Sequence, residues 1–181
     1  SGSGITSAGN TVDFPIGYSS IVVTLSPIDD TNLEGSQTAT MALVDGADYN
    51  LSTAAATISI ADNEGPPTIS FSSATASTKE GTTGTYTVTR STNLGTPTTV
   101  YIARSTVTGT GIATYGATAP GDYTISPGSG TPFSVTISGG ATTATFTLTA
   151  TDDTAQEPTE TATFTIQVNA GYVVGATPTL T

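Results

Sequence analysis

Apolar and polar side chains alternate along most of the chain, with the period that is typical of β-strands. Phe164, Ile166 and Val168, for example, predict a strand that buries one face and exposes the other. The same reasoning predicts strands at 11–16, 21–25, 39–43, 57–60, 68–71, 86–88, 100–102, 135–137 and 146–148. No stretch has the 3.6-residue period of a capped amphipathic helix. The pattern therefore predicts an all-β protein of packed sandwiches.

The chain also contains an internal repeat. When residues 11–49 are laid over residues 134–172 without a gap, thirteen of the 39 positions are identical. The matches include Asp29 with Asp152, Glu34 with Glu157, and Tyr49 with Tyr172. We expect both tyrosines to be packing residues. Because a repeat of this kind indicates repeated structural units, the sequence predicts two similar domains in tandem.

The repeat places the domain boundaries. Residues 1–64 are expected to form the C-terminal part of one sandwich, and residues 68–181 a second sandwich. The linker 65–67 is Gly-Pro-Pro, which is short and stiff because proline fixes φ. Both copies are expected to be truncated. The first lacks its first three strands, and the second stops before the last strand, which 57–60 supplies in the first.

Composition excludes several classes of protein. The chain of 181 residues has 14 acidic and three basic residues, a net charge of -11, and no Cys or His. So few basic residues cannot form a nucleic-acid surface. Cysteine and histidine nucleophile pairs are absent, and we expect no enzymatic activity. No apolar run approaches the roughly 18 residues of a membrane span, so we expect no transmembrane segment.

The acidic residues gather where predicted strands end. One run, 152–160, contains four carboxylates, and its repeat partner, 29–37, contains three. Carboxylates about 4 Å apart repel by roughly 1–4 kcal/mol, depending on the dielectric, whereas a divalent cation would link them. Carboxylate oxygens are the ligands that Ca²⁺ prefers. Solvated turns are the alternative interpretation, because Asp favours turns.

Several of these segments resemble the Calx-beta domain family. The resemblance rests on four segments: Gly121-Asp122-Tyr123, the run from Thr151 to Glu160, Lys79-Glu80-Gly81, and the segment from Thr57 to Glu64. The resemblance extends over almost the whole chain, in two incomplete copies. It implies seven-stranded, immunoglobulin-like β-sandwiches that bind Ca²⁺ at one end.

The resemblance and the repeat together define two candidate metal sites. In the second copy the expected ligands are Glu80, Asp122, Asp152, Asp153, Glu157 and Glu160. In the first copy they are Asp29, Asp30, Glu34, Asp62, Asn63 and Glu64. The first copy has Gln37 where the second has Glu160, so it has one charge fewer.

These features favour a structural or adhesive segment of a secreted or cell-surface fibrous protein. Its Ca²⁺ loops would stiffen the domains and their junctions, and its partners would be neighbouring repeats or identical chains. One alternative is a filament subunit in which each chain completes its neighbour by strand addition. Another is a carbohydrate- or protein-binding module, which clustered aromatic residues would favour.

Overall fold

The computed structural model describes residues 16–116, 121–154 and 156–181. Within these residues it is all-β, which confirms the predicted fold class. The strands are β1 (Gln37–Ala42), β2 (Ala55–Ile60), β3 (Thr68–Phe71), β4 (Thr83–Arg90), β5 (Thr98–Arg104), β6 (Tyr123–Ser126), β7 (Phe133–Ile137), β8 (Thr143–Ala150), β9 (Phe164–Ile166), β10 (Val173–Val174) and β11 (Thr179–Leu180).

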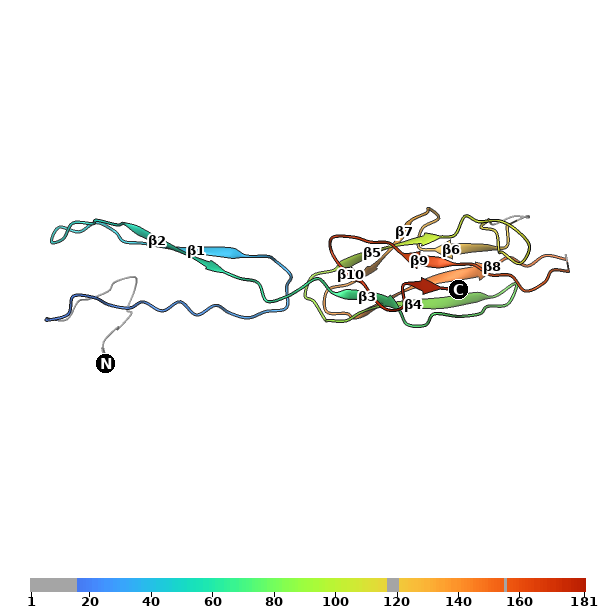
Figure 1. Cartoon of the computed structure of the whole chain (residues 1–181), viewed down its shortest axis with the longest axis horizontal. Helices are drawn as coiled ribbons and strands as arrows, with labels where there is room; N and C mark the ends of the chain where they lie inside the picture. The colour runs from blue at the N-terminus through green and yellow to red at the C-terminus, as the bar shows by residue number, and fades with distance from the viewer. Residues whose placement is uncertain (1–15, 117–120, 155) are drawn as a thin grey trace.

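Strands β3–β11 form two sheets that pack face to face (Figure 1). One sheet has the order β10-β3-β4-β8-β6 and the other β11-β9-β5-β7. All pairs are antiparallel except β10 with β3, which is parallel. The segment from β10 to β11 therefore pairs first with one sheet and then with the other, and it joins the two layers at one side.

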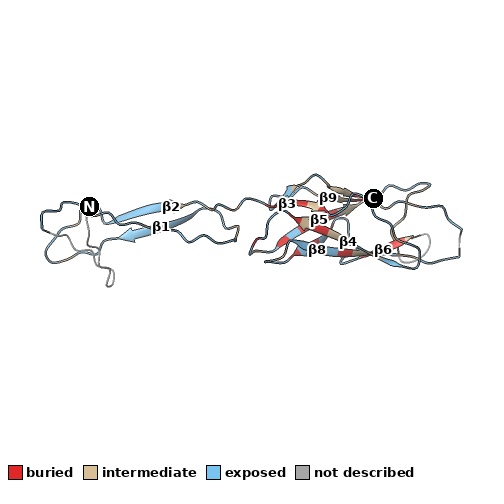
Figure 2. Ribbon diagram, turned by 90° about the horizontal axis from the view of Figure 1, so that it is seen from below, coloured by how far each residue is buried: buried red, intermediate tan, exposed pale blue. Residues whose placement is uncertain are grey.

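The core of the sandwich is aromatic at its centre. The Phe146 ring, on β8, lies 5.3 Å from Phe164 on β9 and 5.3 Å from Phe133 on β7, measured between centroids. Branched residues surround these rings, and Ile69, Val88 and further strand residues are fully buried (Figure 2). The alternation of buried and exposed positions along β5 and β7 is the one that the sequence predicts.

A buried arginine organises the pole of the sandwich that lies nearest to the linker. Arg90, at the end of β4, is only 4% exposed, and all its guanidinium hydrogens have acceptors in the chain. The acceptors are the carbonyls of Ala141, Thr96, Leu94 and Ser138 and the hydroxyl of Thr98. Burial lowers the pKa of Arg90. A charge out of water needs this complete set of hydrogen bonds, so Arg90 holds the two loops 94–98 and 138–141 together.

Residues 37–60 form a long hairpin outside the sandwich (Figure 1). Its pairing puts Met41 opposite Ala56 and Ala39 opposite Ile58, which makes one face apolar. Thr40 lies opposite Thr57 on the other face, where their hydroxyls are 3.0 Å apart. None of the described residues from 16 to 64 is buried, so the apolar face lies open (Figure 2).

Equivalent positions of the sequence repeat have the same local contacts in the two parts of the chain. The Tyr49 hydroxyl donates a hydrogen bond to the carbonyl of Val44, and the Tyr172 hydroxyl donates one to the carbonyl of Gln167. Burial differs, however: Met41 is 47% exposed, whereas Phe164, at the equivalent position, is 2% exposed. Tyr172 is buried, as expected for a packing residue, whereas Tyr49 is exposed.

Two predicted strand positions differ from the structure, and a third cannot be compared with it. The segment 21–25 has no strand assignment, because no strand among the described residues pairs with it. The alternation predicts that Val168 points inward, but Val168 is exposed, because β9 ends at Ile166 and the chain turns before Tyr172. The strand predicted at 11–16 lies outside the described residues, apart from Ile16.

The expected domain boundaries can be compared with the strands. The linker 65–67 has no strand assignment and leads directly into β3, and Pro67 is buried. From the sequence alone, we expect the second copy, residues 68–181, to lack its last strand. In the structure Thr179 and Leu180 pair with Thr165 and Phe164 on β9, and Leu180 is buried. The tandem arrangement itself remains a prediction.

Equivalent positions of the repeat are buried in the sandwich and exposed in the hairpin, and a matched pair of variants tests this difference. Ile166→Ala should lower the free energy of unfolding by about 2–5 kcal/mol, because it leaves a cavity in the core. Leu43→Ala, at the equivalent exposed position, should change it by less than about 0.5 kcal/mol. Urea unfolding measures both values. An equal cost at the two positions would mean that the face of the hairpin is covered in solution.

Candidate functional site

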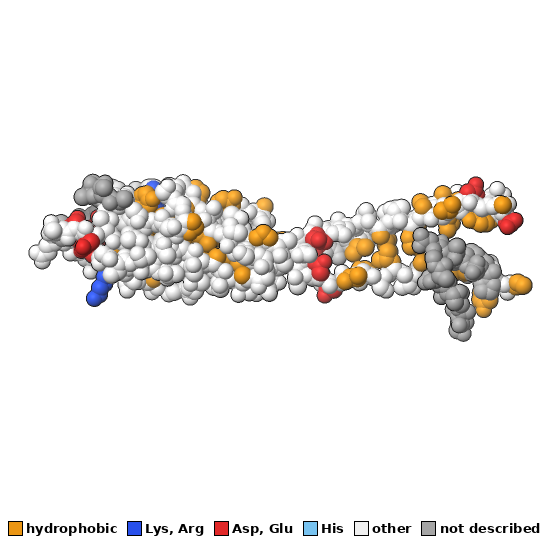
Figure 3. Space-filling model, turned by 180° about the vertical axis from the view of Figure 1, so that it is seen from behind, with side chains coloured by type: hydrophobic (Ala, Val, Ile, Leu, Met, Phe, Trp, Pro, Cys, Tyr) orange, Lys and Arg blue, Asp and Glu red, His pale blue; other side chains and the backbone are white. Residues whose placement is uncertain are grey.

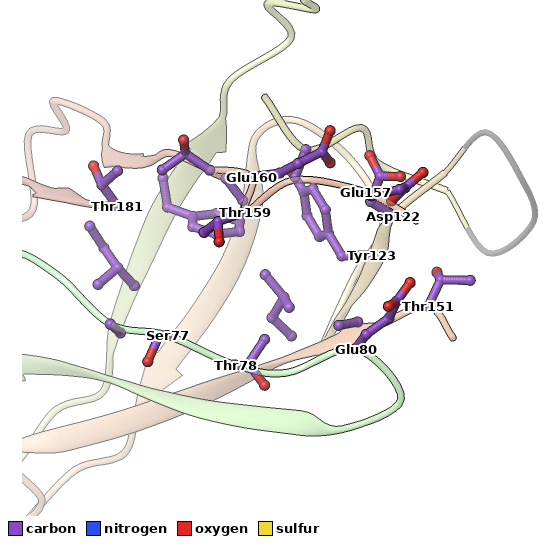
Figure 4. A pocket seen from close by; sticks show the side chains of 18 of the residues that line it. Ser77, Thr78, Glu80, Asp122, Tyr123, Thr151, Glu157, Thr159, Glu160 and Thr181 are labelled. Atoms are coloured by element: carbon purple, nitrogen blue, oxygen red, sulfur yellow. The ribbon is translucent and has the colours of Figure 1, made fainter. Parts of the chain in front are cut away.

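Three carboxylates meet at the pole of the sandwich that lies away from the linker (Figure 4). Asp122 lies just before β6, and Glu157 and Glu160 lie in the connection between β8 and β9. Each offers an oxygen that lies within 4.8 Å of an oxygen of the other two. Two separate loops therefore bring their negative charges to one point, as the sequence predicts for strand ends at one pole.

Backbone hydrogen bonds fix Asp122 in this position. Its N–H donates to the carbonyl of Thr114 at 2.7 Å, and its carbonyl accepts the N–H of Thr151 at 2.8 Å. One of its carboxylate oxygens also accepts the N–H of Thr114. Asp122 is half-buried, and these bonds hold it against Thr114 and Thr151.

Both glutamates of the cluster have a raised pKa. Partial desolvation is the largest cause at Glu160, followed by the negative charge of Asp122 and a side-chain hydrogen bond with it. The pKa of Glu157 is raised in the same way, first by desolvation and then by the charges of Asp153, Asp122 and Glu80. The cluster is therefore electrostatically unfavourable when it is fully ionised, and a cation would relieve this repulsion.

Two of the three other predicted ligands of this copy lie in the same cavity as the cluster. Glu80 and Asp153 line the same cavity as Asp122, Glu157 and Glu160. Asp152 lies beside Gly81, where an added Cβ would meet the Asp152 Cβ at 3.4 Å. Gly81 has a φ of +71°, a conformation that favours glycine, and it lets the β3–β4 loop turn against this residue.

The predicted ligands of the first copy also lie together. They line a second, smaller cavity of about 250 Å³ beside the end of β2, and the six are Asp29, Asp30, Glu34, Asp62, Asn63 and Glu64. The Asn63 amide donates to Asp29 at 2.9 Å, and the N–H of Asn32 donates to Asp30 at 2.7 Å. Asn32 and Gln37 line the cavity as well, although the sequence interpretation did not include them as ligands.

We call the six acidic and amide residues around the smaller cavity the second cluster. Asp62 is the side chain of this cluster with the most hydrogen bonds to the backbone. One of its oxygens accepts the N–H groups of Gly35 and Glu34, each at 2.9 Å. These bonds lower the pKa of Asp62 from 3.8 to about 2, the Gly35 bond most strongly. Its hydrogen bond with Glu64, together with desolvation and negative charge, raises the pKa of Glu64. The Asp62 carboxylate thus already accepts hydrogen bonds from two backbone N–H groups without a cation.

The second cluster lies at the junction between the hairpin region and the sandwich. The N–H of Gly95 donates to the carbonyl of Thr31 at 2.8 Å, and Thr31 follows directly after Asp30. Gly95 belongs to a loop that Arg90 holds, because Arg90 donates to the neighbouring carbonyls of Leu94 and Thr96. Acidic side chains are visible both at this junction and at the far pole (Figure 3).

The structure brings the predicted site residues into two groups, with Asp152 at the margin of one. Each group offers only oxygen ligands, which fits a hard cation such as Ca²⁺, with its six to eight oxygen ligands. The sequence analysis does not identify Arg90, which holds the loop that contacts Thr31 at the junction. Its place among only three basic residues was the only signal in the sequence, because its burial depends on carbonyls from distant loops.

Comparison of the chain with protein-family models, curated proteins and solved structures finds no match. Among the described residues, no helix is long and apolar enough to cross a membrane. The site is therefore interpreted from its own geometry and charge.

Glu160→Gln should raise the melting temperature by a few °C at neutral pH without divalent cations. The variant removes a charge that the neighbouring carboxylates disfavour, although solvent screening limits the gain to about 1 kcal/mol. Because the folded pKa is raised, the charge destabilises the fold as pH rises through that pKa. The gain should therefore vanish in acid, where the wild-type side chain is already protonated.

Asp48→Asn, on the exposed turn of the hairpin, is the control with the same change in charge. Thermal unfolding between pH 4 and pH 7, in the presence of a chelator, gives the comparison. If the two variants have equal melting temperatures at each pH, the effect comes from net charge rather than from the cluster.

Proposed function

We propose that this chain is a structural segment of an extracellular or cell-surface repeat protein of the Calx-beta kind. Its role is non-enzymatic: it holds distance and stiffness between neighbouring repeats. Ca²⁺ is the cofactor, bound by the two carboxylate clusters. The low affinity of extracellular calcium sites, with Kd values of about 10⁻⁴–10⁻³ M, suits loops of this kind.

The position of the two clusters carries this proposal. Glu160 and its neighbours lie at the far pole of the sandwich, whereas Asp62 and its neighbours lie at the junction. A cation at the junction would hold Asp29, Asp30 and Asp62 together beside Thr31, whose carbonyl contacts the sandwich. Binding would then resist bending at the linker, and this is the mechanical property that a fibrous repeat requires.

Ca²⁺ should raise the melting temperature of the sandwich. An ion that binds only the folded state stabilises it by about 1.4 kcal/mol at tenfold excess over Kd. Glu157→Gln and Asp153→Asn should each remove most of this gain, because they reduce the negative charge of the cavity. Differential scanning calorimetry with CaCl₂ and with a chelator measures the shift.

Asp48→Asn should retain the full calcium response, because it lies outside both cavities. Equal melting temperatures with and without Ca²⁺ in the wild-type chain would exclude the calcium role. The structural role would then rest on the fold alone.

A second candidate function is a filament subunit whose copies complete one another by strand addition. The open apolar face of β1 and β2 favours it, because the equivalent residues of the sandwich form part of its core. The segment 21–25 likewise has no strand partner along either edge within the described residues. Uncovered edges and faces of this kind attract another strand.

The mass in solution tests this second candidate. We expect the chain to associate with rising concentration, above its monomer mass of 18.0 kDa, as measured by light scattering after size exclusion. Met41→Glu, on the apolar face, should shift the population toward the monomer. Thr38→Glu, on the polar face of the same strand, should not. A stable, well-folded wild-type monomer would rule out this candidate.

A further inference from the structure

The outer face of the five-stranded sheet carries a continuous array of hydroxyl groups. Its two central strands, β4 and β8, pair over seven consecutive positions without a bulge (Figure 1). The inward residues of this pairing, such as Val88 and Phe146, belong to the core. Every outward residue is a threonine, and the cross-strand pairs are Thr83 with Thr149, Thr85 with Thr147, Thr87 with Thr145, and Thr89 with Thr143.

The flanking strands extend this array to four rows of three hydroxyls each. The added residues lie on β3, directly after it, or on β6, in the pairs Ser70 with Thr89, Ser72 with Thr87, Ser126 with Thr147, and Thr124 with Thr149. No outward position of these rows is charged or aromatic. On the outer face of the other sheet, by contrast, Tyr101 and Ala103 interrupt the hydroxyls of β5. Exposure on a strand therefore does not by itself account for the array.

The strand register gives the array a regular repeat in two directions. The N–H of Arg90 donates to the carbonyl of Thr142, and the N–H of Ala150 donates to the carbonyl of Thr82. The threonine pairs between these bonds are therefore of the non-hydrogen-bonded kind, in which Cα atoms lie about 4.5 Å apart across the strands. Along each strand the threonines recur at every second residue, a distance of about 6.8 Å. Neighbouring strands differ in direction by only about 20–25°, so the two central rows stay close to parallel.

The threonine hydroxyls are held in a narrow set of positions and remain available to water. Because threonine is branched at Cβ, its χ1 angle is restricted, which limits where the hydroxyl and the methyl group can lie. At one end of the array, the hydroxyls of Thr83 and Thr149 are 2.9 Å apart. At its centre, the hydroxyls of Thr85, Thr87 and Thr145 make no hydrogen bond to any other described residue.

We propose that this threonine face binds ice. On the prism face of an ice crystal, oxygen atoms repeat at two spacings close to those of the array across and along its strands. Water molecules bound by the hydroxyls, with threonine methyl groups between them, therefore lie in register with the crystal. A charged side chain would hold its own hydration shell, and the array has none. A polysaccharide fits less well, because sugar rings stack on aromatic side chains and the outward positions offer none.

Ice affinity of the full chain tests the proposal directly. Ice grown slowly on a cold surface should incorporate the wild-type chain, whereas a globular protein without such an array, such as lysozyme, should stay in the liquid. Nanolitre osmometry should show thermal hysteresis, a gap between the melting point and the freezing point, because bound protein resists growth of the crystal. Exclusion of the wild-type chain from the ice would overturn the proposal.

Two variants test the position of the site. Thr85→Tyr and Thr145→Tyr should each lower the fraction of the chain in the ice several-fold, because a large side chain at the centre keeps the crystal from the neighbouring hydroxyls. Thr136→Tyr, at an exposed position on the outer face of β7, is the matched control and should enter ice as the wild type does. Calorimetry shows which variants remain folded. A folded Thr85→Tyr or Thr145→Tyr chain that enters ice like the wild type would contradict the proposed face.

Two further comparisons separate this site from the other proposals. Uptake into ice should be equal with CaCl₂ and with a chelator, because no residue of the array belongs to an acidic cluster. Uptake only in the presence of Ca²⁺ would assign ice binding to those clusters and overturn the proposed face. The wild-type chain should not bind cellulose or chitin powder. Binding to a powder that Thr145→Tyr abolishes would assign the face to a polysaccharide instead of ice.

Discussion

The contact between Phe146 and Phe164 joins the two sheets, and the rest of the sandwich is arranged around it. Phe146 belongs to the five-stranded sheet and Phe164 to the four-stranded sheet, with their ring centroids 5.3 Å apart. Both rings also contact Phe133, on β7. Every loop that carries a carboxylate of the far pole leaves from a strand of this packed body. The acidic cluster is held in place because the sheets beneath it cannot separate without exposing these rings.

The two parts of the chain show that a sequence pattern alone does not bury a residue. Met41 and Phe164 are equivalent, and both lie on an apolar strand face, but only Phe164 has a second sheet above it. The alternation therefore predicts correctly which side chains share a face. It cannot say whether another layer covers that face, because the covering strands come from elsewhere in the fold.

The same limit explains where prediction from the sequence succeeded and where it failed. The fold class and the gathering of Asp122 and Glu160 followed from strand period and from loops that meet at one pole. The failures depend on long-range contacts. Within the described part of the chain, the segment 21–25 lacks neighbouring strands. Val168 follows the end of β9, and Arg90 is buried by carbonyls of distant loops.

The path of the chain through the sandwich has a mechanical consequence. A force applied at Pro67 would pull β3 from its N-terminal end, and an opposite force applied at Thr181 would pull the last segment from its C-terminal end. Because β10 runs parallel to β3, and Thr181 parallel to 74–76, these opposite pulls act along the strands. The hydrogen bonds are then loaded together in shear instead of being opened one after another. Such an arrangement makes the domain resist extension more strongly than its thermal stability alone indicates.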